Sequence, residues 1–378
     1  STTFKYDTSD QMGRLFDLED SGYFYTRLQN PTNDAVAAKI CDLEGGVGAM
    51  LTSSGQAANF YAMFNICEAG GHIVASSAIY GGTYNLLGTT MKKLGIDCTF
   101  VSPEADEAEL QAAIRPNTKL IFGETISNPT LEVLDIELFA RVAHKNGIPL
   151  VVDNTFATPI NCRPFEFGAD IVVHSTTKYM DGHAVQVGGA IIDSGNFSWS
   201  PERYPGMKEY KKYGKFAYLV KLRNGIWRNM GGCLAPMNAY LNIIGMETLG
   251  LRMERVCENA FQLAQALEKL EDVSVNYPLL KSSPYHELAQ KQLYGKGGAI
   301  LTIRTGSKER AYQLINHLKY VKIATNIGDV RTLVIHPAST IYIHSTEEAM
   351  AEAGVYEDTI RISVGICLLY TSDAADDK

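Results

Sequence analysis

Lys178 carries the amine with the clearest potential for chemistry in this sequence. It lies in the segment HSTTKYMDGH, after the apolar run Ile171–Val173 and directly after the hydroxyl-bearing residues Ser175 and Thr177. A short apolar run of this kind predicts a buried strand. A lysine just past such a strand is either a solvated surface cation or a nucleophilic amine in a pocket.

Two further segments carry groups that would complement a nucleophilic amine. The turn Ser53–Gln56 joins a predicted strand to a predicted helix, where small residues and the helix dipole favour an anion. Asp153 ends another apolar run 25 residues before Lys178, about one strand–helix–strand step away. Singly, the turn is an ordinary connection and the aspartate a helix cap. Together they suit pyridoxal 5′-phosphate (PLP), which needs a phosphate cradle, a carboxylate at its ring nitrogen and a lysine for its aldehyde. The hydroxyls of Ser175 and Thr177 would serve the phosphate.

Alternating strands and helices are expected to bring these segments together. A helix is predicted from its cap Asp135 to Gly147, and another follows Gln56 as far as Cys67. This pattern predicts an α/β fold with a mostly parallel seven-stranded sheet, which binds ligands at the carboxyl ends of its strands. The seven strand-like runs lie within residues 47–56, 71–77, 97–104, 118–129, 148–156, 169–177 and 187–195.

The second half of the chain changes character. Residues 196–222 are aromatic, basic and rich in turn residues, which predicts a long surface excursion, and a long helical pattern runs from about residue 236 to 270. One amphipathic helix near 307–319 and four short strands predict a smaller C-terminal α+β domain. The strands fall within 297–306, 322–329, 331–339 and 360–366. The predicted division is a partial N-terminal arm region (1–35), a large PLP-binding domain (36–235), the C-terminal domain (236–366) and a non-native tail (367–378).

Composition narrows the class of protein. Apolar residues make up 46% of the chain and charged residues 20%, and the net charge is −8. An acidic protein of this kind is not expected to bind nucleic acid, and no apolar stretch approaches the roughly 20 residues of a membrane helix. Seven scattered cysteines without a CxxC motif predict reduced thiols in a cytoplasmic protein, and the histidines show no metal-binding spacing. A nucleotide-binding module is disfavoured, because GxGxxG and P-loop motifs are missing.

Six ordered segments resemble the Cys/Met-metabolism family of PLP-dependent enzymes, over residues 1–366. These segments are YFYTRLQNPT, TSSGQAA, SAIYGGTYNLL, ETISNPTLEVLDI, VVDNTFATP and HSTTKYMDGH. The resemblance implies the aspartate-aminotransferase-like fold (PLP fold type I) and a homodimer or homotetramer with shared active sites.

The resemblance also implies a role for each matching residue. Lys178 would form the Schiff base, Asp153 would face the ring nitrogen, and Tyr80 would stack on the ring and assist proton transfer. The phosphate would be held by Gly55, Gln56, Ser175 and Thr177, and by Tyr25 and Arg27 of the neighbouring subunit. Asn128 would lie near the ring hydroxyl, and Arg361 and Asn326 would bind the substrate α-carboxylate.

Within the family, the similarity is strongest to the branch that exchanges the γ-substituent of O-acetylhomoserine for sulfide or a thiol, giving homocysteine or methionine plus acetate. Gly82 and the excursion at 196–222 argue against a methionine γ-lyase without deciding the question, so methionine γ-lyase and cystathionine γ-synthase activities both stay open as alternatives. A further alternative is an inactive fragment that keeps the fold. The family normally has an arm before residue 1 and a helix after residue 366, and both are expected to be missing here.

Overall fold

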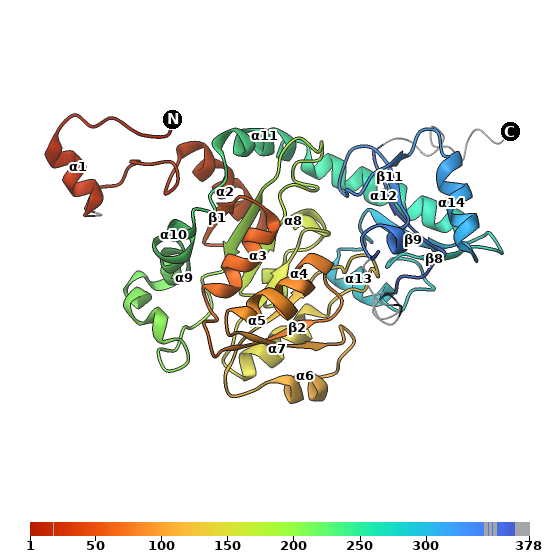
Figure 1. The fold of residues 1–378 in the computed structure, drawn as a ribbon, viewed down its shortest axis with the longest axis horizontal. Helices are drawn as coiled ribbons and strands as arrows, with labels where there is room; N and C mark the ends of the chain where they lie inside the picture. The colour runs from red at the N-terminus through yellow and green to blue at the C-terminus, as the bar shows by residue number, and fades with distance from the viewer. Residues whose placement is uncertain (18, 344–346, 348–349, 351–353, 367–378) are drawn as a thin grey trace.

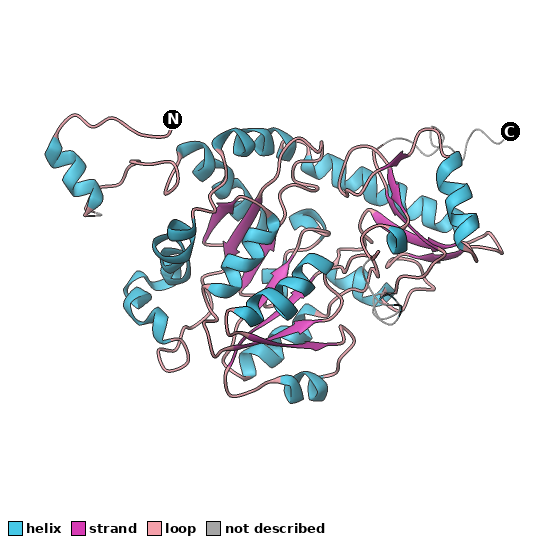
Figure 2. Ribbon diagram, in the orientation of Figure 1, coloured by secondary structure: helices cyan, strands magenta, loops and turns pink. Residues whose placement is uncertain are grey.

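The computed structural model describes residues 1–17, 19–343, 347, 350 and 354–366. The predicted non-native tail, 367–378, lies outside these residues. Two sheets and their covering helices form the body of the molecule (Figure 1, Figure 2). The helices are α1 (Ser9–Phe16), α2 (Pro31–Glu44), α3 (Gly55–Phe64), α4 (Gly81–Asn85), α5 (Met91–Lys93), α6 (Glu107–Ala113), α7 (Ile136–Lys145), α8 (Thr158–Asn161), α9 (Ala217–Leu222), α10 (Arg228–Met230), α11 (Pro236–Met246), α12 (Leu249–Leu267), α13 (His286–Gln292) and α14 (Lys308–His317). Short 3₁₀ or π segments are η1 (Leu86–Thr90), η2 (Pro164–Phe167), η3 (Pro205–Phe216), η4 (Arg223–Trp227) and η5 (Pro337–Ser339).

The first sheet has seven strands in the order β1-β7-β6-β5-β4-β2-β3. Six of them run parallel, whereas β7 is antiparallel to both of its neighbours, β1 and β6. The seven predicted runs therefore form one mostly parallel sheet, as expected. Its strands are β1 (Gly48–Thr52), β2 (His72–Ser76), β3 (Asp97–Val101), β4 (Thr118–Glu124), β5 (Leu150–Asp153), β6 (Ile171–His174) and β7 (Gly189–Asp193).

Helices cover both faces of this sheet, which explains why its strands are apolar throughout. Successive residues of a strand point to opposite faces. Val152 of β5 belongs to a core cluster with residues of α2, α7 and α12, whereas Val151 belongs to a second cluster with residues of α3 and η1. Both valines are fully buried. The sheet is thus the middle layer of three, and its strand ends are the places where polar side chains can meet.

The observed ends of the helices differ from the predicted ends by only a few residues. The carboxylate of Asp135 accepts a hydrogen bond from the backbone N–H of Leu138, and α7 ends before Gly147, whose φ of 64° is the left-handed value that glycine favours. Helix α3 ends at Phe64, so the prediction that it extends to Cys67 is wrong. Cys67 is fully buried beyond the helix, so its apolar character reflects the core rather than the helical pattern.

The predicted surface excursion at 196–222 is partly wrong. Tyr218 is fully buried, and its ring stacks on Trp199 with a centroid distance of 5.6 Å. Tyr204, Met207 and Tyr218 belong to the core cluster that covers one face of the large sheet. The buried aromatic residues of this segment therefore cover the sheet, whereas its exposed residues include lysines, glutamates and the aromatic residues Tyr213 and Phe216.

The second sheet has five strands in the order β10-β11-β12-β9-β8. The helical pattern at 236–270 forms two helices rather than one, because α11 ends at Met246 and α12 begins at Leu249. Helices α12 and α14 pack on this sheet in the blue-green half of Figure 1. Its strands are β8 (Ser274–Asn276), β9 (Ile300–Arg304), β10 (Lys322–Ile323), β11 (Leu333–Ile335) and β12 (Thr359–Ser363). The domain limits themselves stay a prediction.

The N-terminal segment with α1 reaches away from the body of the molecule, at the left of Figure 1. Its apolar side chains Met12 and Phe16 are exposed. None of the helices among the described residues is both long and apolar enough to cross a membrane.

Candidate active site

One cavity of about 310 Å³ lies at the carboxyl ends of the central strands of the large sheet. Its floor comes from β4, β5, the segment after β6 and the start of α3, and residues around β10 and β12 close it from the other side. Ten of the twelve predicted site residues line this cavity. They are Gly55, Gln56, Tyr80, Asn128, Asp153, Ser175, Thr177, Lys178, Asn326 and Arg361.

Lys178 points its amine across the cavity toward the second sheet. Its Nζ donates a hydrogen bond to Oδ1 of Asn326 at 2.8 Å. Burial, and secondarily the positive charge of Arg361, lowers the pKa of the Lys178 amine to about 8. The amine is therefore a partly buried group that lines a pocket, and the surface-cation interpretation of the sequence is wrong.

Asp153 is the last residue of β5, and its carboxylate is fixed by three donors. Oδ1 accepts hydrogen bonds from the N–H and the hydroxyl of Thr155, at 3.0 and 2.6 Å, and Oδ2 accepts one from Nδ2 of Asn59 at 3.2 Å. The Thr155 oxygen also accepts a hydrogen bond from the N–H of Ser175 at 2.8 Å. This hydroxyl thereby ties the end of β5 to the segment that carries Lys178.

The start of α3 forms a site for an anion. The first N–H groups of a helix lack partners within the helix, and none of the described residues accepts a hydrogen bond from the N–H of Gly55 or Gln56. A Cβ on Gly55 would lie 2.5 Å from Cβ of Ser175, so only glycine allows the helix to approach the strand this closely. The hydroxyl of Thr177 lies on the same turn as Ser175. It donates a hydrogen bond to the carbonyl of Gly188 and accepts one from the N–H of Gly188.

Tyr80 stands at the mouth of the cavity, with 49% of its surface exposed. Its backbone N–H donates a hydrogen bond to Oε1 of Glu124 at 2.8 Å. Glu124 is buried at the end of β4, directly beside Asp153 on β5. Burial and the neighbouring Asp153 raise the pKa of the Glu124 carboxyl well above its usual range. The cavity thus holds two acids in different environments.

Arg361 enters the cavity from β12 of the second sheet. It is only 3% exposed, and burial lowers its pKa to about 10. Nη1 donates to Oδ1 of Asn128 at 3.0 Å, and Nη2 donates to the carbonyl of Asn326 at 3.3 Å. Its Nε is buried and donates to none of the described residues. Asn128, predicted near the cofactor ring, therefore also orients the guanidinium.

Tyr25 and Arg27 do not line the cavity of their own chain. The Arg27 guanidinium lies 5.6 Å from the centroid of the Tyr25 ring, and its Nη1 donates to the carbonyl of Arg228 at 2.7 Å. Tyr25 is 39% exposed. This outward position leaves their predicted role in a neighbouring subunit as a prediction.

Asn59, Thr155 and Glu124 are among the cavity residues that were not predicted from the sequence. Asn59 lies four residues after Gly55, and therefore on the same face of α3, and Thr155 lies two residues after Asp153. Glu124 ends a strand in register with Asp153. The available signal was that the runs IFGE and LVVD both end in an acid, which places two carboxylates at adjacent strand ends.

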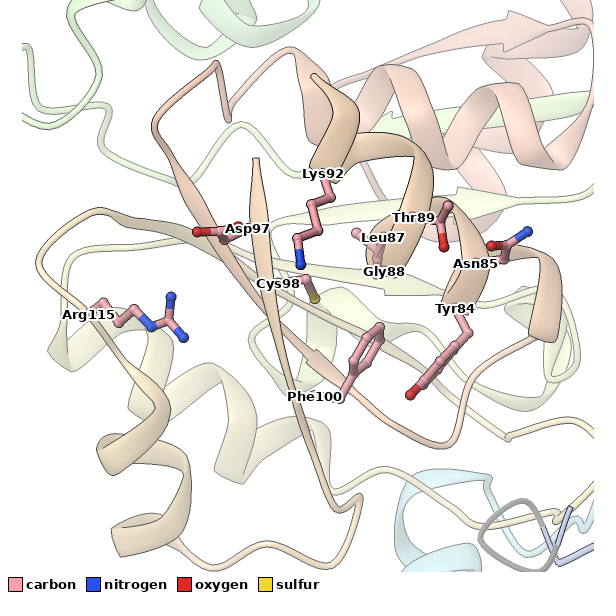
Figure 3. Close-up of a pocket in the computed structure, with 10 residues that line it drawn as sticks. All are labelled: Tyr84, Asn85, Leu87, Gly88, Thr89, Lys92, Asp97, Cys98, Phe100 and Arg115. Carbon is pink, nitrogen blue, oxygen red and sulfur yellow. The ribbon is translucent and has the colours of Figure 1, made fainter. Parts of the chain in front are cut away.

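A second and larger cleft, about 540 Å³, contains none of the predicted site residues. Figure 3 shows Lys92 beside Cys98, Arg115 at the left of the cleft, and Tyr84 lying against Phe100. Its lysine and arginine are exposed surface residues. Size alone therefore does not identify the active site, and Lys92 offers a lysine outside it for comparison.

The cavity residues fit PLP. The free N–H groups at the start of α3 and the hydroxyl of Ser175 suit a phosphate, Asp153 offers a fixed carboxylate for a ring nitrogen, and Lys178 offers an amine for an aldehyde. A volume of about 310 Å³ falls in the usual range of cofactor pockets.

Comparison with known proteins agrees with this chemistry. The family described as "Cys/Met metabolism PLP-dependent enzyme" matches residues 1–369. The O-acetyl-L-homoserine sulfhydrylase of Corynebacterium glutamicum is 44% identical, over 97% of this chain and 87% of the relative. A homocysteine synthase of Schizosaccharomyces pombe is 42% identical, over 97% and 89%.

A solved structure extends the comparison to the fold. A candidate O-acetylhomoserine (thiol)-lyase of Campylobacter jejuni superposes with a TM-score of 0.92 at 34% identity, over 97% of this chain and 90% of that chain. Its structure contains N′-pyridoxyl-lysine-5′-monophosphate, in which a lysine is joined to the cofactor. The predicted aspartate-aminotransferase-like fold is confirmed.

Proposed function

The chain belongs to the Cys/Met-metabolism family of PLP-dependent enzymes, and we propose that it catalyses γ-replacement on O-acetylhomoserine. Sulfide, or a thiol, forms the new bond at Cγ while the bond from Cγ to the acetyl oxygen breaks. The products are acetate and homocysteine, or methionine when the thiol is methanethiol. One observation carries the proposal: an amine, a fixed carboxylate and a buried guanidinium line a single cavity, as Lys178, Asp153 and Arg361.

PLP supplies an aldehyde that condenses with amino groups and a ring that withdraws electrons from the substrate Cα. The carboxylate of Asp153, held by Thr155 and Asn59, keeps a proton on the ring nitrogen. The amine of Lys178 would accept the Cα proton of the substrate, and burial favours the uncharged amine that this step needs by lowering its pKa from 10.5 to about 8. The same amine moves a proton at Cβ, so that acetate can leave from Cγ.

The other side chains orient the substrate. Arg361 binds the α-carboxylate through a planar guanidinium, which matches two oxygens better than a lysine would. Its Nε, which donates to none of the described residues, supports this role because a donor is still available. Apolar side chains from several segments complete the lining of the cavity. These are Ile126, Phe156, Val187, Ile327 and Ile341.

The deciding experiment supplies the purified full chain with cofactor and then with three substrate sets. O-Acetylhomoserine with sulfide should yield homocysteine and acetate. Oxobutyrate and ammonia from methionine alone would support a γ-lyase instead, and cystathionine from O-acetylhomoserine with cysteine would support a cystathionine γ-synthase. A normal visible spectrum of the bound cofactor without any turnover would support the inactive-fragment alternative.

We propose further that the protein is a homodimer or homotetramer in which Tyr25 and Arg27 reach the phosphate of a neighbouring subunit. Their exposure outside the cavity supports this, as does an exposed apolar surface on nearby helices at Met230 and Met237. Mixing Arg27→Ala with Lys178→Ala chains after denaturation should restore part of the activity, because a mixed dimer contains one intact site. Each variant refolded alone is the control, and no recovery in the mixture would contradict shared sites.

We also propose a cytoplasmic location, which is supported by free thiols at the six cysteines among the described residues. Detection of the protein in a membrane or secreted fraction of its native cell would contradict this.

A further inference from the structure

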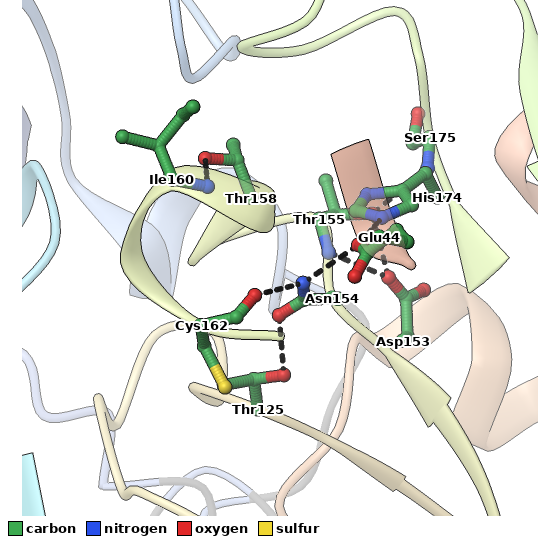
Figure 4. Close-up of polar contacts among 10 residues, drawn as sticks. All are labelled: Glu44, Thr125, Asp153, Asn154, Thr155, Thr158, Ile160, Cys162, His174 and Ser175. Carbon is green, nitrogen blue, oxygen red and sulfur yellow. Dashed lines mark hydrogen bonds and ion pairs between the residues drawn. The ribbon is translucent and has the colours of Figure 1, made fainter. Parts of the chain in front are cut away.

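A buried hydrogen-bond network joins the ends of β4, β5 and β6 (Figure 4). Its side chains do not line the cavity. Glu44, the last residue of α2, accepts two hydrogen bonds at Oε1, from Nε2 of His174 at 2.5 Å and from Nδ2 of Asn154 at 2.9 Å. Oδ1 of Asn154 in turn accepts a hydrogen bond from the hydroxyl of Thr125 at 2.7 Å. All four side chains are buried, and those of Glu44 and His174 are 0% and 1% exposed.

The network and the cavity share the same three strand ends. Successive residues point to opposite sides of a strand, so each network residue has a chain neighbour that faces the cavity. The pairs are Thr125 and Glu124 at the end of β4, Asn154 and Asp153 at the end of β5, and His174 and Ser175 at the end of β6. The backbone ladder continues through these ends, because Thr125 N–H donates to the Asp153 carbonyl and Asn154 N–H to the Val173 carbonyl.

We propose that Glu44 is a positioning residue for the cofactor site, which it serves by fixing the ends of β4, β5 and β6 relative to one another from behind. The inference rests on the proposed function in that the cavity must bind PLP. Asp153 and Ser175 would face the ring nitrogen and the phosphate of one rigid molecule, so a small shift between β5 and β6 changes both contacts together. Glu44 is suited to prevent such a shift, because a single oxygen contacts residues of both strands.

Because Glu44 uses only one carboxylate oxygen, two variants can separate the loss of its negative charge from the loss of its hydrogen bonds. Oε2 of Glu44 accepts no hydrogen bond from the described residues. Glu44→Gln keeps an oxygen for His174 and Asn154 and places the amide nitrogen at the unused position. Glu44→Leu keeps the approximate size of the side chain and removes both hydrogen bonds.

The opposite end of the sheet provides a matched control. His72 begins β2 and is fully buried, with Nδ1 2.8 Å from the hydroxyl of Thr118 and Nε2 2.9 Å from that of Thr99. This network also links adjacent strands, but at their amino ends, and none of its residues lines the cavity. A purely structural role should appear to a similar extent in Glu44→Leu and His72→Leu.

The main measurement is the dissociation constant of the cofactor, obtained by titrating the full-length apoprotein with PLP and following visible absorbance. The melting temperature, kcat and KM of each variant are measured alongside. Glu44→Leu should weaken cofactor binding by about 10- to 100-fold, the range found for residues that orient metal ligands. Glu44→Gln should keep the cofactor affinity of wild type, because the oxygen that accepts both hydrogen bonds is retained. His72→Leu should lower the melting temperature without changing cofactor affinity. Thr125→Val, which removes one outer hydroxyl, should weaken cofactor binding by only a few-fold and serves if Glu44→Leu does not fold.

The outcomes separate this inference from the proposed reaction. Equal cofactor affinity in wild type, Glu44→Leu and Thr125→Val would overturn the role of Glu44. The same holds if His72→Leu weakens cofactor binding as much as Glu44→Leu does. A wild-type protein that binds PLP but does not convert O-acetylhomoserine would overturn the proposed reaction, while the affinity comparison would still decide the role of Glu44.

Discussion

The two walls of the cavity are built differently. On the side of the large sheet, the Asp153 carboxylate receives three hydrogen bonds from Thr155 and Asn59, so this acid is held in place without a ligand. On the side of the second sheet, Arg361 is buried with a donor, Nε, that has no acceptor among the described residues. Because leaving a buried donor without a partner is unfavourable, the second wall is arranged for an acceptor that arrives with the ligand. We therefore propose that the first wall holds the resident cofactor and the second the exchanging substrate.

Removal of the Lys178 amine should have the largest effect on activity. Lys178→Ala should lower kcat by at least about 10²–10⁴-fold, because a positioned acid–base group is lost together with the attachment point of the cofactor. Activity assays and borohydride trapping of the cofactor check this. Lys92→Ala, which removes an exposed lysine in the cleft of Figure 3, is the control. A covalent adduct that persists in Lys178→Ala would refute the assignment.

Removal of the Asp153 carboxylate should impair the wall of the cavity that is proposed to hold the cofactor. Asp153→Ala should reduce kcat by about 10²–10³-fold, the range for removal of one preorganised electrostatic partner, with a smaller change in KM. The visible absorbance of the bound cofactor should shift as well, because the proton on the ring nitrogen is no longer held. Asp97→Ala, at an exposed position of the cleft, provides the comparison. Unchanged kcat and absorbance would show that Asp153 does not face the ring.

A change in the substrate wall should act on substrate binding rather than on the cofactor. Arg361→Lys should raise KM for O-acetylhomoserine by roughly 10- to 150-fold, which corresponds to the loss of charged hydrogen bonds of about 1.5–3 kcal/mol. Cofactor affinity should stay near that of wild type, as a separate titration can test. The control is Arg331→Lys. Arg331 forms an ion pair with Asp329 and its side chain is 58% exposed, so this change should alter neither KM nor cofactor affinity. A fall in cofactor affinity with constant KM would reverse the assignment of the two walls.

The smallest effect concerns the stability of the cofactor-free protein. Burial lowers the pKa of Lys178 from 10.5 to about 8, so below pH 8 the folded state holds a buried charge that the unfolded chain solvates. Between pH 8 and 10.5 the unfolded state binds more protons, and stability therefore rises with pH in this window. Lys178→Met should be more stable than wild type by about 1–3 kcal/mol at pH 7, with the difference shrinking toward pH 10.5.

Chemical denaturation of the apoprotein at a series of pH values measures this difference. Lys92→Met, at an exposed position, should give a difference that does not vary with pH over the same window. A Lys178→Met protein with the stability of wild type at every pH would mean that the cavity solvates the amine.

Much of the large sheet could be predicted because its signals are local. Apolar runs such as those ending at Asp153 and His174 specify strands by the need to bury them, and the alternation with helices specifies parallel order. The sequence also indicated Lys178 and Asp153 as neighbours, since parallel strands end at the same edge. The segment 196–222 was misread because an aromatic side chain such as Tyr218 has no periodic partner that marks it as buried.

Local pattern therefore determined the strands, the turn at Gly55 and the chemical types of the groups at the strand ends. Tertiary structure alone decided which distant side chains meet: Arg361 contacts Asn128 from 233 residues away, and Glu44 contacts His174 from 130 residues away. The physical reason is that burial of an apolar run depends on the residues within it. A contact between two polar side chains depends instead on how helices and sheets pack, and no periodicity in the chain records that packing.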